Sequence, residues 1–149
     1  MIRHFLTRLR RAVQRPPILQ VAALCLRQAS GKTEVLLIKS LDSGRWIIPK
    51  GWPMKGRTLA QAAEIEAWEE AGVRGQISPD AVGTYYYPKR RGSGVAQPCD
   101  VHVFTLVVQS EAADFPEAAQ RHRAWFSAAS AAARLADPEL AALLRRLAP

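Results

Sequence analysis

The sequence predicts an α+β fold, a mixed α/β sandwich in which one mixed sheet is flanked by a carboxylate-bearing helix and by C-terminal helices. Three observations support this fold class. Short apolar runs recur along the chain, one stretch with helical periodicity interrupts them, and an Ala- and Leu-rich stretch ends the sequence. A chain of 149 residues with 48% hydrophobic and 23% charged residues fits a single domain with a real core.

The apolar runs predict the strands of the sheet. Residues 18–27 (ILQVAALCLR) and 34–39 (EVLLIK) form a hairpin around a turn at 28–33, and a short strand at 46–48 ends at Pro49. Further strands are expected at 73–77, 82–87, 101–108 and 124–126. Residues 88–98 are expected to be a basic loop between two of these strands.

The central helix has clear sequence signals at both ends. Thr58 and Gln61 form the T-x-x-Q pattern of a capping box, and Gly72 follows the last periodic residues as a stop signal. From Ser127 onward the sequence predicts one or two helices, interrupted at Asp137-Pro138.

Residues 1–15 differ from the rest of the chain and predict a basic amphipathic extension, with the domain at 16–149. Such a helix can lie on a membrane, bind a polyanion, dock on the domain or form a partly ordered tail. The segment lacks the apolar stretch of a signal peptide, and no run approaches the roughly 20 apolar residues of a membrane span. Cys25 and Cys99 predict no disulfide framework, as in a cytoplasmic protein.

The charge of the chain favours an anionic partner. Its formal net charge is +8 and its isoelectric point is near 10.2. Such an excess attracts polyphosphates, acidic lipids or nucleic acids. No helix-turn-helix, RNA-binding or zinc-finger pattern is present, so an anionic small molecule is expected rather than nucleic acid as the main partner.

The central helix carries an unusual set of carboxylates. On a helix with about 100° per residue, Glu66, Glu69 and Glu70 fall within one sector of about 100°. This sector also holds apolar residues of the preceding turns. Three carboxylates at this spacing repel one another and are costly near a core unless a cation neutralises them. The pattern indicates a Mg²⁺ site; a surface acidic cluster paired with arginines is the alternative.

Residues 51–73 (GWPMKGRTLAQAAEIEAWEEAGV) resemble the Nudix box, G-x5-E-x7-R-E-U-x-E-E-x-G-U, where U is a bulky aliphatic residue. Six residues fall on motif positions with the spacing intact: Gly51, Glu66, Glu69, Glu70, Gly72 and Val73. Two positions depart, because Arg57 stands where the family has its first glutamate and Ile65 where it has arginine. The first departure puts in doubt a supporting contact or an additional metal, and the second leaves the glutamates without their usual orienting arginine.

The resemblance implies a Nudix fold and a Mg²⁺-dependent hydrolase, with Mn²⁺ as another usable ion. Glu66, Glu70 and the carbonyl of Gly51 are the expected metal ligands, and Glu69 is a ligand or the general base and is therefore the catalytic residue. The stretches 39–40, 45–51 and 121–126 also resemble the diphosphoinositol polyphosphate and diadenosine polyphosphate phosphohydrolase branch. The residues expected to bind the substrate are Lys39, Ser40, Arg45, Lys50, Lys89, Arg90, Arg91, Arg121 and Arg123.

Two other functions remain open from the sequence. One is a pyrophosphatase that acts on nucleoside di- or triphosphates or on ADP-ribose. The other is a Nudix module that has lost turnover and binds polyphosphate or RNA; Arg57 and Ile65 favour this reading, and the three glutamates oppose it. The oligomeric state is not indicated.

Overall fold

The computed structural model describes residues 16–90 and 96–147, with the side chain of Arg90 excepted. The predicted extension at 1–15 and the predicted phosphate ligand Arg91 lie outside the described residues. The strands are β1 (Ile18–Ala29), β2 (Lys32–Lys39), β3 (Trp46–Ile47), β4 (Lys50–Gly51), β5 (Val73–Ile77), β6 (Gly83–Arg90), β7 (Ala96–Glu111) and β8 (Arg123–Ser127). The helices are α2 (Leu59–Ala71), α3 (Ala128–Arg134) and α4 (Pro138–Leu147).

The strands form one mixed sheet with the order β3-β2-β1-β7-β5. The central pair, β1 and β7, runs parallel, with Val21 beside His102, whereas every other pairing is antiparallel. Strand β4 pairs with β1, β6 with β7, and β8 with β2. The α+β fold predicted from the sequence is confirmed.

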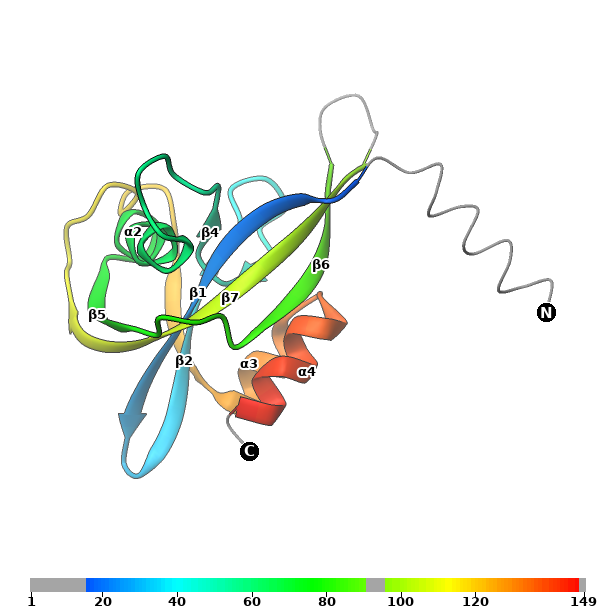
Figure 1. The fold of residues 1–149 in the computed structure, drawn as a ribbon. Helices are drawn as coiled ribbons and strands as arrows, with labels where there is room; N and C mark the ends of the chain where they lie inside the picture. Colours follow the sequence, from blue (N-terminus) through cyan, green and yellow to red (C-terminus); the bar gives the residue numbers. More distant parts are fainter. Residues whose placement is uncertain (1–15, 91–95, 148–149) are drawn as a thin grey trace, which may run out of the picture.

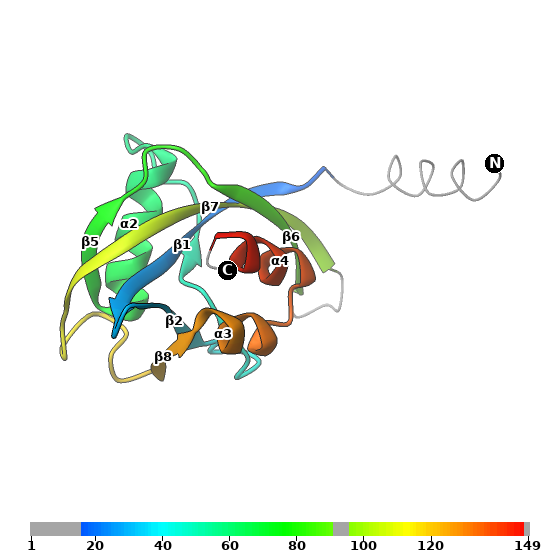
Figure 2. The same ribbon diagram turned by 90° about the horizontal axis from the view of Figure 1, so that it is seen from below.

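Helices cover both faces of this sheet, with α2 on one face and α3 and α4 on the other (Figures 1 and 2). Alternation along β1 explains how one strand serves two cores. Val21, Ala23 and Cys25 belong to the core under α2, and Ala22 and Leu24 belong to the core under α3 and α4. All five side chains are fully buried.

The structure corrects two details of the predicted elements. Strand β6 continues to Arg90 and β7 begins at Ala96, so most of the basic loop expected at 88–98 is a paired ribbon in which Pro88 lies opposite Pro98. Prolines are tolerated here because a strand at the edge of a sheet needs no ladder bond from them. The short strand β4 was expected to be loop; it is held by pairing of Gly51 with Val21.

No helix in the described ranges is long and apolar enough to cross a membrane. Cys25 and Cys99 are both buried and neither forms a disulfide. Burial raises the pKa of the Cys25 thiol to about 12, so this side chain is an unreactive member of the core.

Candidate active site

The helix α2 is fixed at both ends by the predicted caps. The Thr58 hydroxyl accepts from the Gln61 amide at 3.1 Å, the Gln61 side chain accepts from the Thr58 amide at 2.9 Å, and Gly72 is left-handed with φ 68°. The face that packs on the sheet consists mainly of buried alanines at positions 60, 62, 63, 67 and 71. Because alanines are small, the helix backbone approaches the sheet closely, and Glu70 is carried into the buried layer with them.

A cleft of about 300 Å³ opens beside the C-terminal half of this helix. Seven of its lining residues were predicted from the sequence to hold metal or substrate: Ser40, Lys50, Gly51, Glu66, Glu70, Lys89 and Arg121. These residues come from segments far apart in the chain, and the pairing of β1 with β4 brings Lys50 and Gly51 next to the helix. The fold therefore gathers most of the predicted site in one place.

Glu70 is held on both of its oxygens. The Lys50 backbone amide donates to Oε2 at 3.1 Å, and the guanidinium of Arg121 lies 3.5 Å from Oε1. Glu66 lies directly against the backbone of Gly51, where a Cβ atom would overlap its carboxylate. A side chain at position 51 would displace the Glu66 carboxylate from this position.

Without a bound cation, the carboxyl groups of Glu66 and Glu70 keep their protons to a higher pH than ordinary glutamates do. Burial, reinforced by the charges of Glu69 and Glu117, raises the pKa of Glu66 to about 7. Burial also raises the pKa of Glu70 to about 8, although the charge of Arg121 lowers it. Two neighbouring acids with raised pKa values in a cleft are typical of functional sites.

The oxygen atoms around this point fit a hard divalent cation. Glu66 and Glu70 supply two carboxylates, and Oε1 of Gln20, on β1, is a buried oxygen without a hydrogen-bond partner among the described residues. Mg²⁺ prefers such oxygen ligands and retains several waters. No group of three or more His, Cys, Asp or Glu side chains in the described part of the chain is arranged to hold a metal. An ion here would rest on two carboxylates, amide or backbone oxygens and water.

Arg121 is the buried cation of the site. Its side chain is 8% exposed, its Nε contacts Glu117 at 3.0 Å, and its Nη1 donates to the carbonyl of Lys39 at 3.0 Å. The backbone amide of Glu117 in turn donates to the carbonyl of Glu69 at 3.0 Å. Arg121 therefore links the 112–122 loop and β2 to the end of α2. Its guanidinium also compensates the charge of Glu70.

The remaining predicted residues divide into those near the cleft and those away from it. Arg45 lines an adjoining hollow, while the ammonium of Lys39 lies 5.0 Å from the Trp46 ring centroid outside the cleft lining. Glu69 is also outside that lining, so its predicted roles as ligand and base stay predictions. Arg90 belongs to β6.

Arg123 was predicted to bind substrate, but its contacts give it a structural function. Its Nη1 donates to the carbonyl of Ala71 at 2.6 Å, its Nη2 donates to the carbonyl of Ala112, and its Nε lies 3.3 Å from Glu111. All three guanidinium nitrogens are thus committed at the end of α2.

Several lining residues were not predicted from the sequence. They are Gln20, Leu41, Asp42, Ile47, Trp52 and Tyr87. Gln20 carried a usable signal, because it is the single polar residue inside the otherwise apolar run ILQVAALCL. The ring centroid of Tyr87 lies 4.3 Å from the ammonium of Lys50. Leu41, Asp42 and Trp52 come from loops, whose positions depend on tertiary packing, and Ile47 comes from the two-residue strand β3.

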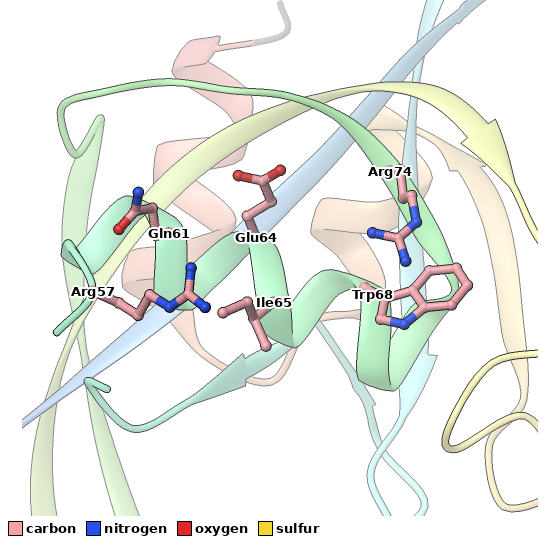
Figure 3. A pocket seen from close by; sticks show the side chains of 6 residues that line it. All are labelled: Arg57, Gln61, Glu64, Ile65, Trp68 and Arg74. Atoms are coloured by element: carbon pink, nitrogen blue, oxygen red, sulfur yellow. The ribbon is translucent and has the colours of Figure 1, made fainter. Parts of the chain in front are cut away.

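The two residues that depart from the motif lie together in a different pocket. Arg57 and Ile65 line a hollow of about 230 Å³ that shares no residue with the cleft. Figure 3 shows Arg57 reaching toward Ile65, while Arg74 stacks on the Trp68 ring at 3.9 Å. Both residues that depart from the motif therefore lie away from the cleft.

Comparison with known proteins agrees with this geometry. The sequence matches the NUDIX domain over residues 18–147. Nudix hydrolase 16, mitochondrial, of Arabidopsis thaliana is 36% identical over 102 residues, which are 66% of this chain and 56% of the relative. Nudix hydrolase 21, chloroplastic, of the same plant is 33% identical over 106 residues, 70% of this chain and 52% of the relative. The chain spans about half the length of these curated relatives.

Solved structures share the fold. An Ap4A hydrolase from C. elegans superposes with a TM-score of 0.63 at 23% identity, covering 89% of this chain and 96% of that one. The E. coli dihydroneopterin triphosphate pyrophosphohydrolase gives a TM-score of 0.68 at 18% identity, with 91% and 97% covered. The family match over nearly the whole described domain, with two of the three motif glutamates in a common cleft, establishes that the chain belongs to the Nudix family.

Proposed function

We propose that this protein is a hydrolase that uses a divalent metal ion to cleave a phosphoanhydride bond in a polyphosphorylated small molecule. One observation carries the proposal: Glu66 and Glu70 face a cleft that also holds the cations Lys50, Lys89 and Arg121. A site that only bound anions would gain nothing from a buried and a half-buried carboxylate, because they repel phosphate. With a metal ion between them and the phosphates, the same carboxylates become favourable.

The residues that carry this proposal have separate functions. Glu66 and Glu70 hold Mg²⁺ or Mn²⁺. The backbone of Gly51 and the side-chain amide of Gln20 supply the other polar atoms around the ion. When bound, such an ion polarises phosphoryl oxygens and lowers the pKa of the attacking water. Lys50 and Lys89 neutralise phosphate oxygens, and Glu69 remains the proposed general base. Arg121 keeps Glu70 in position.

The substrate is proposed from the resemblance and the chemistry of the cleft together. Diphosphoinositol polyphosphates and diadenosine polyphosphates are the first candidates, and nucleoside di- or triphosphates and ADP-ribose are the alternatives. A Nudix module that binds polyphosphate or RNA without turnover is the alternative of another class; Arg57 and Ile65, which favour it, lie outside the cleft. A cytoplasmic location remains a prediction from the cysteines.

The direct test is hydrolysis of this substrate panel by the full chain with Mg²⁺, with Mn²⁺ and with excess EDTA. We expect phosphate or nucleotide release with either ion and none with EDTA. Glu70→Gln is expected to abolish release, and Glu64→Gln is the matched control, because it makes the same change on the same helix outside the cleft. Folded protein that releases nothing from any panel member under these conditions contradicts the proposal.

A further inference from the structure

The cleft continues beyond the two glutamates into a second hollow of about 550 Å³. The two hollows share four lining residues, Ser40, Asp42, Ile47 and Tyr87, and therefore form one continuous cleft. If the proposed function holds, the phosphates lie over Glu66 and Glu70, and the group attached to them occupies the second hollow. The chemistry of that hollow consequently selects the substrate.

The charges of the described cleft residues are balanced, although the whole chain is strongly basic. The cations that line the two hollows are Lys50, Lys89, Arg121 and Arg45, and the carboxylates are Glu66, Glu70, Asp42 and Asp137. Of the formal charge of +8, the first 15 residues supply five arginines and no acid, and they lie outside the described part. In the second hollow itself, Arg45 faces two carboxylates. This hollow does not attract a further set of phosphates.

Asp137 is the best placed of these carboxylates. It precedes Pro138, the first residue of α4, and its backbone carbonyl accepts from the Ala141 amide at 3.0 Å, so its main chain is fixed. An aspartate at this position usually caps the helix with its side chain. Here the half-buried carboxylate makes no hydrogen bond and no ion pair within 4 Å with any residue in the described ranges, although the charges of Lys50 and Arg45 act on it from farther away. Its oxygens are therefore available to a ligand.

A carboxylate without a hydrogen bond in a substrate cleft attracts some groups of a ligand and repels others. It accepts hydrogen bonds from amino and hydroxyl groups, and bonds to an ionised acceptor are the stronger kind. It also repels phosphate, so an inositol ring with phosphates on all sides is disfavoured here, whereas an uncharged nucleoside offers amino and hydroxyl donors. Discrimination between related ligands commonly combines such attraction with repulsion.

We propose that Asp137 is a specificity-determining residue, which accepts a hydrogen bond from an uncharged nucleoside joined to the polyphosphate and excludes a densely phosphorylated ring. The aromatic ring of Tyr87, half-buried where the two hollows meet, forms the wall between phosphate and nucleoside. The sequence resemblance alone implied both substrate classes, and the second hollow favours the dinucleoside or nucleoside class.

The experiment compares wild type, Asp137→Ala and Asp137→Asn of the full chain, with Asp114→Ala as an exposed control outside the cleft. Hydrolysis of diadenosine tetraphosphate, inorganic tripolyphosphate and a diphosphoinositol pentakisphosphate is measured with Mg²⁺. Binding of AMP, which has no phosphoanhydride bond to cleave, is measured separately by calorimetry. Circular dichroism checks that each variant is folded.

We expect Asp137→Ala to lower the ratio of kcat/KM for diadenosine tetraphosphate to that for tripolyphosphate about tenfold and to weaken AMP binding by a similar factor. Asp137→Asn is expected to bind AMP better than the alanine variant and to accept the inositol substrate better than wild type. A wild-type preference for the inositol substrate, or AMP binding that is equal in wild type and Asp137→Ala, overturns the proposal. A protein that binds AMP through Asp137 but hydrolyses no substrate instead supports this inference and contradicts the proposed hydrolase.

Discussion

The two sides of helix α2 carry opposite kinds of residues. The side that faces the cleft has Glu66 and Glu70, two acids whose pKa values are raised by burial. The other side, with Arg57 and Ile65, lines a shallow hollow in which two arginines, a glutamate and apolar side chains mix (Figure 3). Glu66, Glu70 and Ile65 belong to the same capped helix, Arg57 lies just before it, and all four belong to the same motif.

This difference shows which part of the motif the chemistry needs. Burying two carboxylates side by side destabilises a folded protein, and the chain retains them only at the cleft. At the other side, where no reacting group lies, the motif glutamate and arginine have both been replaced. The two departures from the motif therefore lie away from the cleft.

The largest expected effect on activity comes from neutralising an acid on the cleft side of α2, and the comparison is an acid on its outer side. Glu70→Gln is expected to lower kcat/KM roughly a thousandfold, because losing several kcal/mol of metal-assisted stabilisation corresponds to about three powers of ten in rate. Glu64→Gln, on the outer side, is expected to stay within about threefold. Steady-state kinetics of both variants gives the answer, and equal losses would abolish the distinction between the two sides.

A methyl group at Gly51 tests the contact between β4 and the helix. In Gly51→Ala the new Cβ overlaps the Glu66 carboxylate, so that side chain must move out of its position. We expect Mg²⁺ affinity, measured by titration calorimetry, to fall between about ten- and a hundredfold, the range typical for displaced supporting contacts of a metal site. Unchanged affinity together with normal activity would show that Glu66 is not held by this approach.

Substitutions of Arg121 and Arg57 compare how much a buried and an exposed cation contribute to the free energy of unfolding. Arg121→Met removes the partner of Glu70 and Glu117 at a side chain that is 8% exposed, so we expect a loss of about 3 kcal/mol in the free energy of unfolding. Arg57→Met, at the exposed hollow, is expected to change it by less than about 0.5 kcal/mol. Urea unfolding measures both. Arg121→Lys keeps the charge, and recovery of most of the loss in this variant would assign the effect to charge rather than to the guanidinium geometry.

The raised pKa values predict a characteristic pH dependence of stability. Glu66 and Glu70 hold protons more tightly in the folded chain, with pKa values of about 7 and 8 against 4.5 for an ordinary glutamate. Their contribution to stability is therefore complete below about pH 4.5 and is lost as the pH rises to about 8. For metal-free protein we expect Tm to fall by roughly 5 °C across this range, less in Glu70→Gln, and Mg²⁺ to reverse the fall. A Tm that rises over this range contradicts the burial of these acids.

The smallest effect is expected from restoring the motif on the outer side. Arg57→Glu combined with Ile65→Arg rebuilds the family pair in a pocket separate from the cleft. We expect kcat/KM to change by less than about threefold. An increase of a hundredfold would show that the replaced pair limits the reaction, and the two sides of the helix would then be coupled.

The sequence was sufficient for the parts of the molecule that follow from local patterns. Thr58, Gln61 and Gly72 predicted the ends of α2, and helical spacing placed Glu66 and Glu70 in one sector, because each depends on neighbours within two turns. Strand pairing between residues far apart in the sequence was harder to predict from local patterns. The strand at Lys50–Gly51 exists because β1 lies beside it, and two residues predict no strand by pattern.

The substrate side of the site depended still more on tertiary structure. Arg121 and Arg123 look alike in the stretch RHRAWF, yet one contacts Glu70 and the other the carbonyls at the end of α2. Asp137 was noted from the sequence only as a helix interruption, and nothing local places it in the cleft. The overall charge of +8 pointed to a densely anionic substrate, although five of those charges lie in residues 1–15.

The central claim, that the inner side of α2 is a working metal site, is tested most directly by Mn²⁺ titration followed by electron paramagnetic resonance. We predict that wild type and Glu64→Gln bind Mn²⁺ with the same affinity, that Mg²⁺ competes for the site, and that Glu70→Gln loses this binding. Mn²⁺ binding that survives in Glu70→Gln, or no binding in folded wild-type protein, would contradict the account.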